Sequence, residues 1–98
     1  MSGSLTDIWI ATEDGRDLVR ADAIVMLRVD DTGRMTAQLR DESRVSVTLL
    51  EGGASRVPPD GFHRALIRAV AQLADSSGAQ LVRAVNGSQG WRWISEPM

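Results

Sequence analysis

Residues 60–75 read DGFHRALIRAVAQLAD, and this stretch decides the fold. Its large apolar side chains recur at spacings of three and four, which predicts a helix with one apolar face. The residues of that face are Phe62, Leu66, Ala69, Val70 and Leu73. Asp60 is the expected N-cap, and Ser76-Ser77-Gly78 is expected to end the helix.

Outside this helix the apolar residues alternate with a period of two, from Thr6 to Leu50 and again from Gln80 to Ile94. That period is typical of β-strands. The pairs Asp14-Gly15 and Asn86-Gly87 favour tight hairpins, so neighbouring strands are expected to be antiparallel. The expected strands cover residues 6–12, 18–29, 34–40, 44–49, 81–85 and 91–94. The sequence therefore predicts the α+β class: a twisted antiparallel sheet in the order β-β-β-β-α-β-β, with one helix packed on one face.

Breaks in the pattern mark the irregular segments. Ala21-Asp22 interrupts the longest strand and is expected to form a bulge, because the apolar phase changes there. Glu51–Asp60 contains two glycines and two prolines and is expected to be the loop that leads into the helix. The chain of 98 residues predicts a single domain, residues 1–98, with an ordered core over residues 6–94 and an unstructured tail, Ser95–Met98.

The composition is that of an ordinary soluble globular domain, with 43% apolar residues, 24% charged residues and a net charge of -2. Cysteine is absent, which excludes disulfides, a thiolate nucleophile and a cysteine zinc site. No apolar run is long enough for a membrane helix, and a cytoplasmic location is expected. Arginine supplies all eleven basic residues, which we interpret as the codon bias of a GC-rich bacterial genome.

The opening strands carry more apolar surface than one helix can cover. The first two expected strands are apolar on both faces, whereas a helix of about sixteen residues shields roughly one face of a few strands. Exposing those side chains would cost a substantial part of a marginal stability. Three arrangements resolve the mismatch: the sheet curls towards a barrel, a second copy packs on it, or a ligand occupies it.

This surplus leads to the function that the sequence favours. Trp91 and Trp93 alternate across Arg92 and share one side of the last strand, and Trp9 joins them if the first and last strands are close. We therefore expect a non-catalytic module that docks onto another protein, or forms a homodimer, through an apolar sheet surface. The residues expected in that surface are Trp9, Ile24, Met26, Trp91 and Trp93.

Two alternative functions use other features of the sequence. Arg34, Arg40 and Arg44 are expected on one solvated sheet face, which could bind nucleic acid or an acidic protein surface. That face has no aromatic residue for base stacking, so the nucleic-acid hypothesis is the less favoured one. The other alternative is a small-molecule-binding protein with a pocket lined by the tryptophans.

The sequence predicts no catalytic residue, metal site or cofactor. His63, the sole histidine, could serve as an acid or base, but no nucleophile with an activating motif accompanies it. The acidic clusters at residues 13–17 and 30–31 are expected to form hydrogen bonds within hairpin turns, because their spacing matches no calcium loop. Gly52–Arg56 precedes the helix, and it is interpreted as a linker and not as a phosphate-binding loop.

Overall fold

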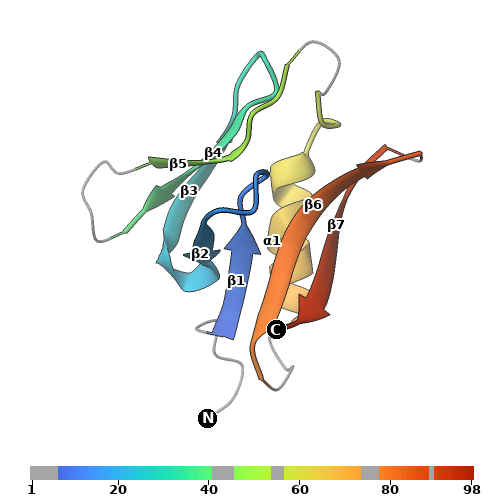
Figure 1. Ribbon diagram of the computed structural model, residues 1–98. Helices are drawn as coiled ribbons and strands as arrows, with labels where there is room; N and C mark the ends of the chain where they lie inside the picture. Colours follow the sequence, from blue (N-terminus) through green and yellow to red (C-terminus); the bar gives the residue numbers. More distant parts are fainter. Residues whose placement is uncertain (1–6, 41–45, 54–56, 74–77, 89) are drawn as a thin grey trace.

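The computed structural model describes residues 7–40, 46–53, 57–73, 78–88 and 90–98. Within these ranges it contains one α-helix and strands grouped in two sheets (Figure 1). The elements are β1 (Ile8–Ala11), β2 (Leu18–Arg20), the 3-10 turn η2 (Ala21–Ala23), β3 (Ile24–Val29), β4 (Met35–Leu39), β5 (Ser46–Leu50), α1 (Phe62–Gln72), β6 (Gln80–Gly87) and β7 (Gly90–Pro97). The predicted α+β class and the single covering helix are confirmed.

Sheet A contains four strands in the order β2-β1-β6-β7. The pairs β1/β2 and β6/β7 are antiparallel hairpins, whereas β1 and β6 are parallel, with Ile10 beside Val82. This parallel pair differs from the purely antiparallel sheet that was expected. It forms because the segment that contains α1 returns the chain to the edge of β1 that the first hairpin leaves unpaired. Sheet A is therefore mixed, and its strands come from both ends of the chain.

Sheet B is a three-stranded antiparallel meander in the order β3-β4-β5. The sequence placed β2 and β3 in one strand, residues 18–29, but η2 separates them and directs β3 into sheet B. The irregularity expected at Ala21-Asp22 is therefore a 3-10 turn. A separate register shift lies between Ile24 and Met26, where Val25 is the extra residue.

The core lies between the two sheets and the helix. It contains Ile8 and Ile10 from β1, Met35 and Ala37 from β4, and Leu66 from α1, all at most 2% exposed. In Figure 1 the helix lies behind β6, against the same face of sheet A that carries Ile8 and Ile10. Sheet B and α1 together form the layer over sheet A, which covers part of the surplus apolar surface that the sequence indicated.

The start of α1 is held by close backbone packing. A Cβ atom on Gly52 would lie 2.6–2.7 Å from backbone atoms of Thr32, Gly33 and Arg34, and the Gly53 N–H donates to the Thr32 carbonyl oxygen at 2.9 Å. Gly33 in turn packs against Pro58, in the loop that leads to the helix. The turn between β3 and β4 therefore fixes where the helix begins relative to sheet B.

Several element ends differ from the predictions. Asn86-Gly87 was expected to form a turn, but both residues belong to β6, and Gly87 pairs with Gly90 of β7. The helix was expected to extend to Asp75, but α1 ends at Gln72 with Leu73 as its C-cap.

Gly61, in the left-handed conformation with φ 76°, is the N-cap in place of Asp60, because the Phe62 N–H donates to the Pro59 carbonyl oxygen and tightens the entry to the helix. The tail Ser95–Met98 was expected to be unstructured, but β7 continues to Pro97, and the Met98 N–H donates to the Ala79 carbonyl oxygen. Pairing with the start of β6 provides the partners that the polar tail sequence did not indicate.

Candidate protein-binding surface

The helix α1 has two flanks on either side of its buried stripe. Phe62, Leu66 and Val70 form that stripe and are at most 9% exposed. Tryptophans of β7 cover one flank, which we call the aromatic flank. The other flank faces β3 across a groove. The two flanks differ in how far their apolar side chains are buried.

The aromatic flank consists of Phe62, Trp91 and Trp93. The Phe62 ring stacks on Trp93 with a centroid distance of 4.7 Å and an interplanar angle of 16°, and it lies 5.9 Å from Trp91 in a tilted arrangement. The Trp93 Nε1–H donates to the Phe62 carbonyl oxygen at 2.9 Å. These contacts attach β7 to α1, so the two tryptophans complete the core on this side.

The outer side of the aromatic flank borders a shallow depression of about 370 Å³, which Arg68 and Arg92 also line. This depression is where a pocket lined by Trp91 and Trp93 would lie. The small-molecule hypothesis therefore has a defined location, although one ring of the pair is already stacked on Phe62.

The groove on the other flank, which we call the β3–α1 groove, has a volume of about 370 Å³. Residues from β1, η2, β3 and α1 line it: Ile10, Ala21, Ile24, Val25, Met26, Leu27, His63, Leu66, Ile67, Val70 and Ala71. His63 is the one residue of this lining that is not apolar. Val25, Met26 and Ile67 remain 54%, 43% and 58% exposed, so large apolar side chains on both walls are in contact with solvent.

His63 lines this apolar groove and carries a buried polar atom. Its Nδ1 atom is buried and has no hydrogen-bond partner in the part of the chain that the structure describes. A buried polar atom without a partner costs free energy, which native structures usually avoid. The groove thus has exposed apolar side chains on both walls, and one of its lining residues carries a buried polar atom without a partner among the described residues.

A second apolar strip lies on the outer face of sheet A. Trp9 points away from its neighbours Ile8 and Ile10, and the Arg20 guanidinium lies 5.8 Å from the Trp9 ring centroid. Leu81, beside Trp9 in the register, is half-buried on the same face. Neither Trp9 nor Leu81 packs against the core, so they form a strip separate from the groove.

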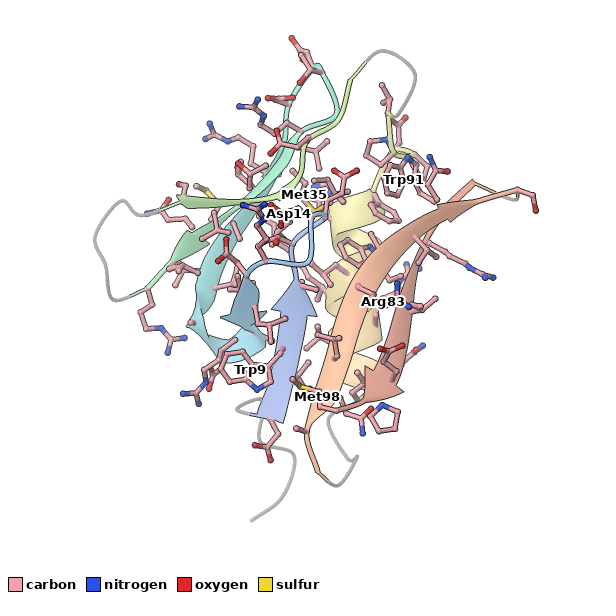
Figure 2. The ribbon with its side chains drawn as sticks, in the orientation of Figure 1. Trp9, Asp14, Met35, Arg83, Trp91 and Met98 are labelled. Atoms are coloured by element: carbon pink, nitrogen blue, oxygen red, sulfur yellow. The ribbon has the colours of Figure 1, made fainter. Side chains whose placement is uncertain are left out.

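The five residues predicted for one apolar surface therefore lie in three places. Ile24 and Met26 line the β3–α1 groove, Trp91 and Trp93 belong to the aromatic flank, and Trp9 lies on the outer face of sheet A. Figure 2 shows Trp9 beside β1 and Trp91 near the start of α1, far apart in the molecule. Trp9 was expected to join the other two tryptophans if the first and last strands were close, and that condition is not met, because β6 separates β1 from β7.

The arginines of the predicted polyanion face are divided as well. Arg34 precedes β4 and lies 3.6 Å from a carboxylate oxygen of Glu51, and Arg40 is exposed after β4. Arg44 lies outside the described residues. The outer face of sheet B carries Arg28 with Thr36 and Thr48, as the alternation predicted for the two threonines.

The acidic turns behave as predicted. The Asp14 carboxylate accepts hydrogen bonds from the Thr12 hydroxyl and the Arg16 N–H, and Asp30 accepts from the Thr32 hydroxyl and the Arg34 N–H. The Arg16 N–H is the largest cause that lowers the pKa of Asp14, and the Thr32 hydroxyl is the largest that lowers the pKa of Asp30. Within the described ranges no group of three or more potential ligands could hold a metal ion.

Two exposed apolar residues of the groove, Ile67 and Val25, were not among the residues predicted for the apolar surface. Ile67 lies off the predicted apolar stripe of α1, and Val25 is the second of four consecutive apolar residues in β3. The sequence contained a signal for each. Ile67 is a large apolar residue outside the predicted buried stripe, and Val25 lies in an apolar run that does not follow simple alternation. These patterns indicate apolar side chains that the fold does not cover.

Comparison of the chain with protein-family models, with curated proteins and with solved structures finds no match. No helix within the described ranges has both the length and the apolar character needed to cross a membrane.

Proposed function

We propose that this protein is a non-catalytic protein-interaction module that binds its partner through the β3–α1 groove. The observation that carries the proposal is the presence of three large, roughly half-exposed apolar side chains, Val25, Met26 and Ile67, around one concave apolar surface. Exposed apolar surface that is concave and contiguous is typical of binding sites. Trp91 and Trp93 contribute indirectly, because they hold α1 in place from its other flank.

The apolar contacts supply part of the binding free energy. Burying an aliphatic side chain completely is worth roughly 1.5–3 kcal/mol, so covering these three half-exposed residues contributes on the order of 2–4 kcal/mol. A micromolar complex requires about 8 kcal/mol. The partner must therefore also form contacts with the polar rim of the groove or with neighbouring surface.

Two classes of partner satisfy this proposal: a second copy of the chain and a different protein. A homodimer would bury the groove residues of both copies in one symmetric interface. The proposal includes a cytoplasmic location, which the sequence favours because it has no apolar run long enough for a membrane helix. Light scattering over a range of concentrations separates the two classes, because only a second copy raises the mass of the purified protein.

Photo-cross-linking tests the binding surface whatever the identity of the partner. Ile67 is replaced by p-benzoylphenylalanine in cells that express the protein naturally, and the cells are irradiated. We expect one discrete cross-linked product, identified by mass spectrometry, that disappears when Met26→Glu is added to the opposite wall of the groove. The matched control places the cross-linker at Thr32, in the exposed turn between β3 and β4. No discrete product at position 67, or the same product from position 32, would contradict the proposal.

A further inference from the structure

We propose that the β3–α1 groove receives an extended segment of a different protein, which pairs with the free edge of β3 as an added strand of sheet B. This inference rests on the proposed function and specifies how the partner binds. Three features carry it: the position of the groove along the edge of β3, backbone groups of that edge that pair with no described strand, and a lining without acidic or arginine side chains.

The groove follows the edge of β3 and not one of its faces. Successive side chains of a strand point to opposite faces of the sheet, yet four consecutive residues, Ile24–Leu27, line the groove. Met26 also lines a depression on the outer face of sheet B, whereas Leu27 packs against the core. Among the described residues none from β4 lines the groove, so it borders the edge of β3 that β4 leaves open.

The backbone groups of Leu27 and Val29 are directed at this open edge. In an antiparallel pair, residues whose N–H and C=O groups face the partner strand alternate with residues whose groups face away. The Asp30 N–H donates to the Arg34 carbonyl oxygen at 3.0 Å, so Asp30 faces β4, and the unbroken register extends this alternation back to Met26. Leu27 and Val29 therefore face away from β4, and within the described ranges no backbone hydrogen bond joins them to another segment.

The other sheet edges that the structure describes are less suited to pairing. The strand β2 has three residues, and β7 ends in Glu96-Pro97, where a charge and the missing N–H of proline hinder the addition of a strand. The outer edge of β5 is already engaged, because its Leu49 carbonyl oxygen accepts the Glu13 N–H at 2.9 Å. The edge of β3 combines an apolar run with unpaired backbone groups, which makes it a template for an added strand.

The lining of the groove selects the side chains of the added strand. The part of the lining that the structure describes contains no Asp, Glu or Arg. A charged side chain that faced α1 would lose its water without gaining an opposite charge, whichever its sign. Alternate side chains of an added strand would contact Ile67, and apolar β-branched residues suit both that contact and the extended conformation.

The shape of the groove favours a different protein over a second copy of this chain. In a two-fold dimer the same surface must meet itself. Two concave grooves that face each other would enclose space that neither fills, whereas an extended segment enters a single groove. Hydrogen bonds to the backbone of Leu27 and Val29 would add to the apolar contacts, which alone fall short of a micromolar complex.

The test removes hydrogen-bond donors from a peptide and leaves the protein unchanged. The probe is a capped peptide of alternating Val and Thr, with a Lys at each end for solubility, and NMR of the ¹⁵N-labelled protein follows its binding. Two variants carry N-methyl groups on every Val or on every Thr, because the N–H groups of alternate residues point to opposite edges of a strand. We expect one variant to bind at least about 10-fold more weakly than the parent peptide and the other within about 2-fold of it.

The responding amides identify the edge that the peptide uses. The parent peptide should shift the amides of Leu27, Val29 and Ile67 and should slow hydrogen exchange at Leu27 and Val29, while the Ile94 amide of β7 stays unchanged. Ile67→Asp should abolish this response. The matched control is Arg68→Asp, at the next residue of α1, which is exposed and borders the depression beside the tryptophans, and it should leave the response intact. Replacing every Val of the peptide by Glu or by Lys should weaken binding at least about 10-fold in both cases.

The outcomes separate this inference from the proposed function. No response at Leu27 and Val29, or equal weakening by the two N-methylated variants, would overturn the inference. If the Ile67 amide shifts while both variants bind like the parent peptide, the groove binds side chains without strand pairing, so the inference fails and the proposed function stands. A dimer in solution that Ile67→Asp converts to a monomer has the same consequence. Failure of the proposed function itself is recognised by the absence of a cross-linked product at position 67.

Discussion

The two flanks of α1 differ in how completely their side chains are packed. On the aromatic flank, Phe62 is 3% exposed, stacks on Trp93 and accepts its indole N–H. On the groove flank, one turn further along the helix, Ile67 is 58% exposed and the Nδ1 atom of His63 has no partner among the described residues. A single helix thus packs one flank against the tryptophans of β7 and leaves a large apolar side chain of the other flank exposed to solvent.

The largest effect should come from truncating a buried side chain of the aromatic flank. Phe62→Ala removes a buried ring that touches both tryptophans of β7, and we expect it to lower the free energy of unfolding by about 3–5 kcal/mol. Urea denaturation followed by tryptophan fluorescence measures this loss. The matched change in the β3–α1 groove, Ile67→Ala, should lower the free energy of unfolding by less than about 0.5 kcal/mol, because that side chain is mostly exposed to solvent. Similar losses in the two variants would show that the flanks do not differ in packing.

The second largest effect should come from disrupting the close backbone packing of Gly52 against the turn between β3 and β4. In Gly52→Ala the new Cβ meets backbone atoms at 2.6–2.7 Å, at a φ of +74°. The left-handed conformation costs roughly 1–2 kcal/mol, and the overlap roughly 1–3 kcal/mol more. Gly15→Ala is the control, because Gly15 has the same φ but no atom within 4 Å of the new Cβ, and it should show the smaller loss alone.

This variant also separates the two flanks of the helix. Relief of the overlap moves sheet B relative to α1, so amide chemical shifts in β3 should change more than those of Trp91 and Trp93. If the β7 amides shift as strongly as those of β3, the placement of sheet B is not independent of the aromatic flank.

A smaller effect is expected from removing one hydrogen bond of the aromatic flank. Trp93→Phe keeps an aromatic ring beside Phe62 but removes the Nε1–H donor, and we expect a loss of about 1 kcal/mol in the free energy of unfolding. Thermal denaturation by circular dichroism measures the change. Trp9→Phe, on the outer face of sheet A, should cost less because Trp9 does not pack against the core. Equal losses would mean that the hydrogen bond to Phe62 contributes nothing specific.

The sequence predicted the elements of this fold better than their arrangement. The change from period two to period 3.6 located the helix and most strands, because that signal depends on neighbours along the chain. The division into two sheets depends on η2 and on the parallel pairing of β1 with β6, which bring distant residues together. Alternation alone contains no information on such long-range pairing.

The candidate site was predicted in part for the same reason. Surplus apolar surface was expected along the first strands, and Ile24 and Met26 do line the groove. Whether Trp9 lies near the other two tryptophans depended on the order of the strands, and the side of a strand that faces the core cannot be read from the sequence where both sides are apolar. Ile67 and His63 were recognisable as residues off the buried stripe of α1, but their position opposite β3 requires the structure.

Acid should affect the turns of the molecule before either flank of α1, and this is the smallest effect we expect. The pKa values of Asp14 and Asp30 are lowered in the folded state by hydrogen bonds within their turns, and both carboxylates are exposed. A lowered pKa contributes stability that is present above the unfolded-state pKa of about 3.9 and is lost as the pH falls through the folded-state value. Urea midpoints at pH 6 and pH 3 should therefore differ less in the double variant Asp14→Asn, Asp30→Asn than in the wild type. Asp31→Asn is the control, because the Asp31 carboxylate accepts none of the turn hydrogen bonds described for Asp30. An unchanged acid sensitivity in the double variant would show that the turns do not contribute to it.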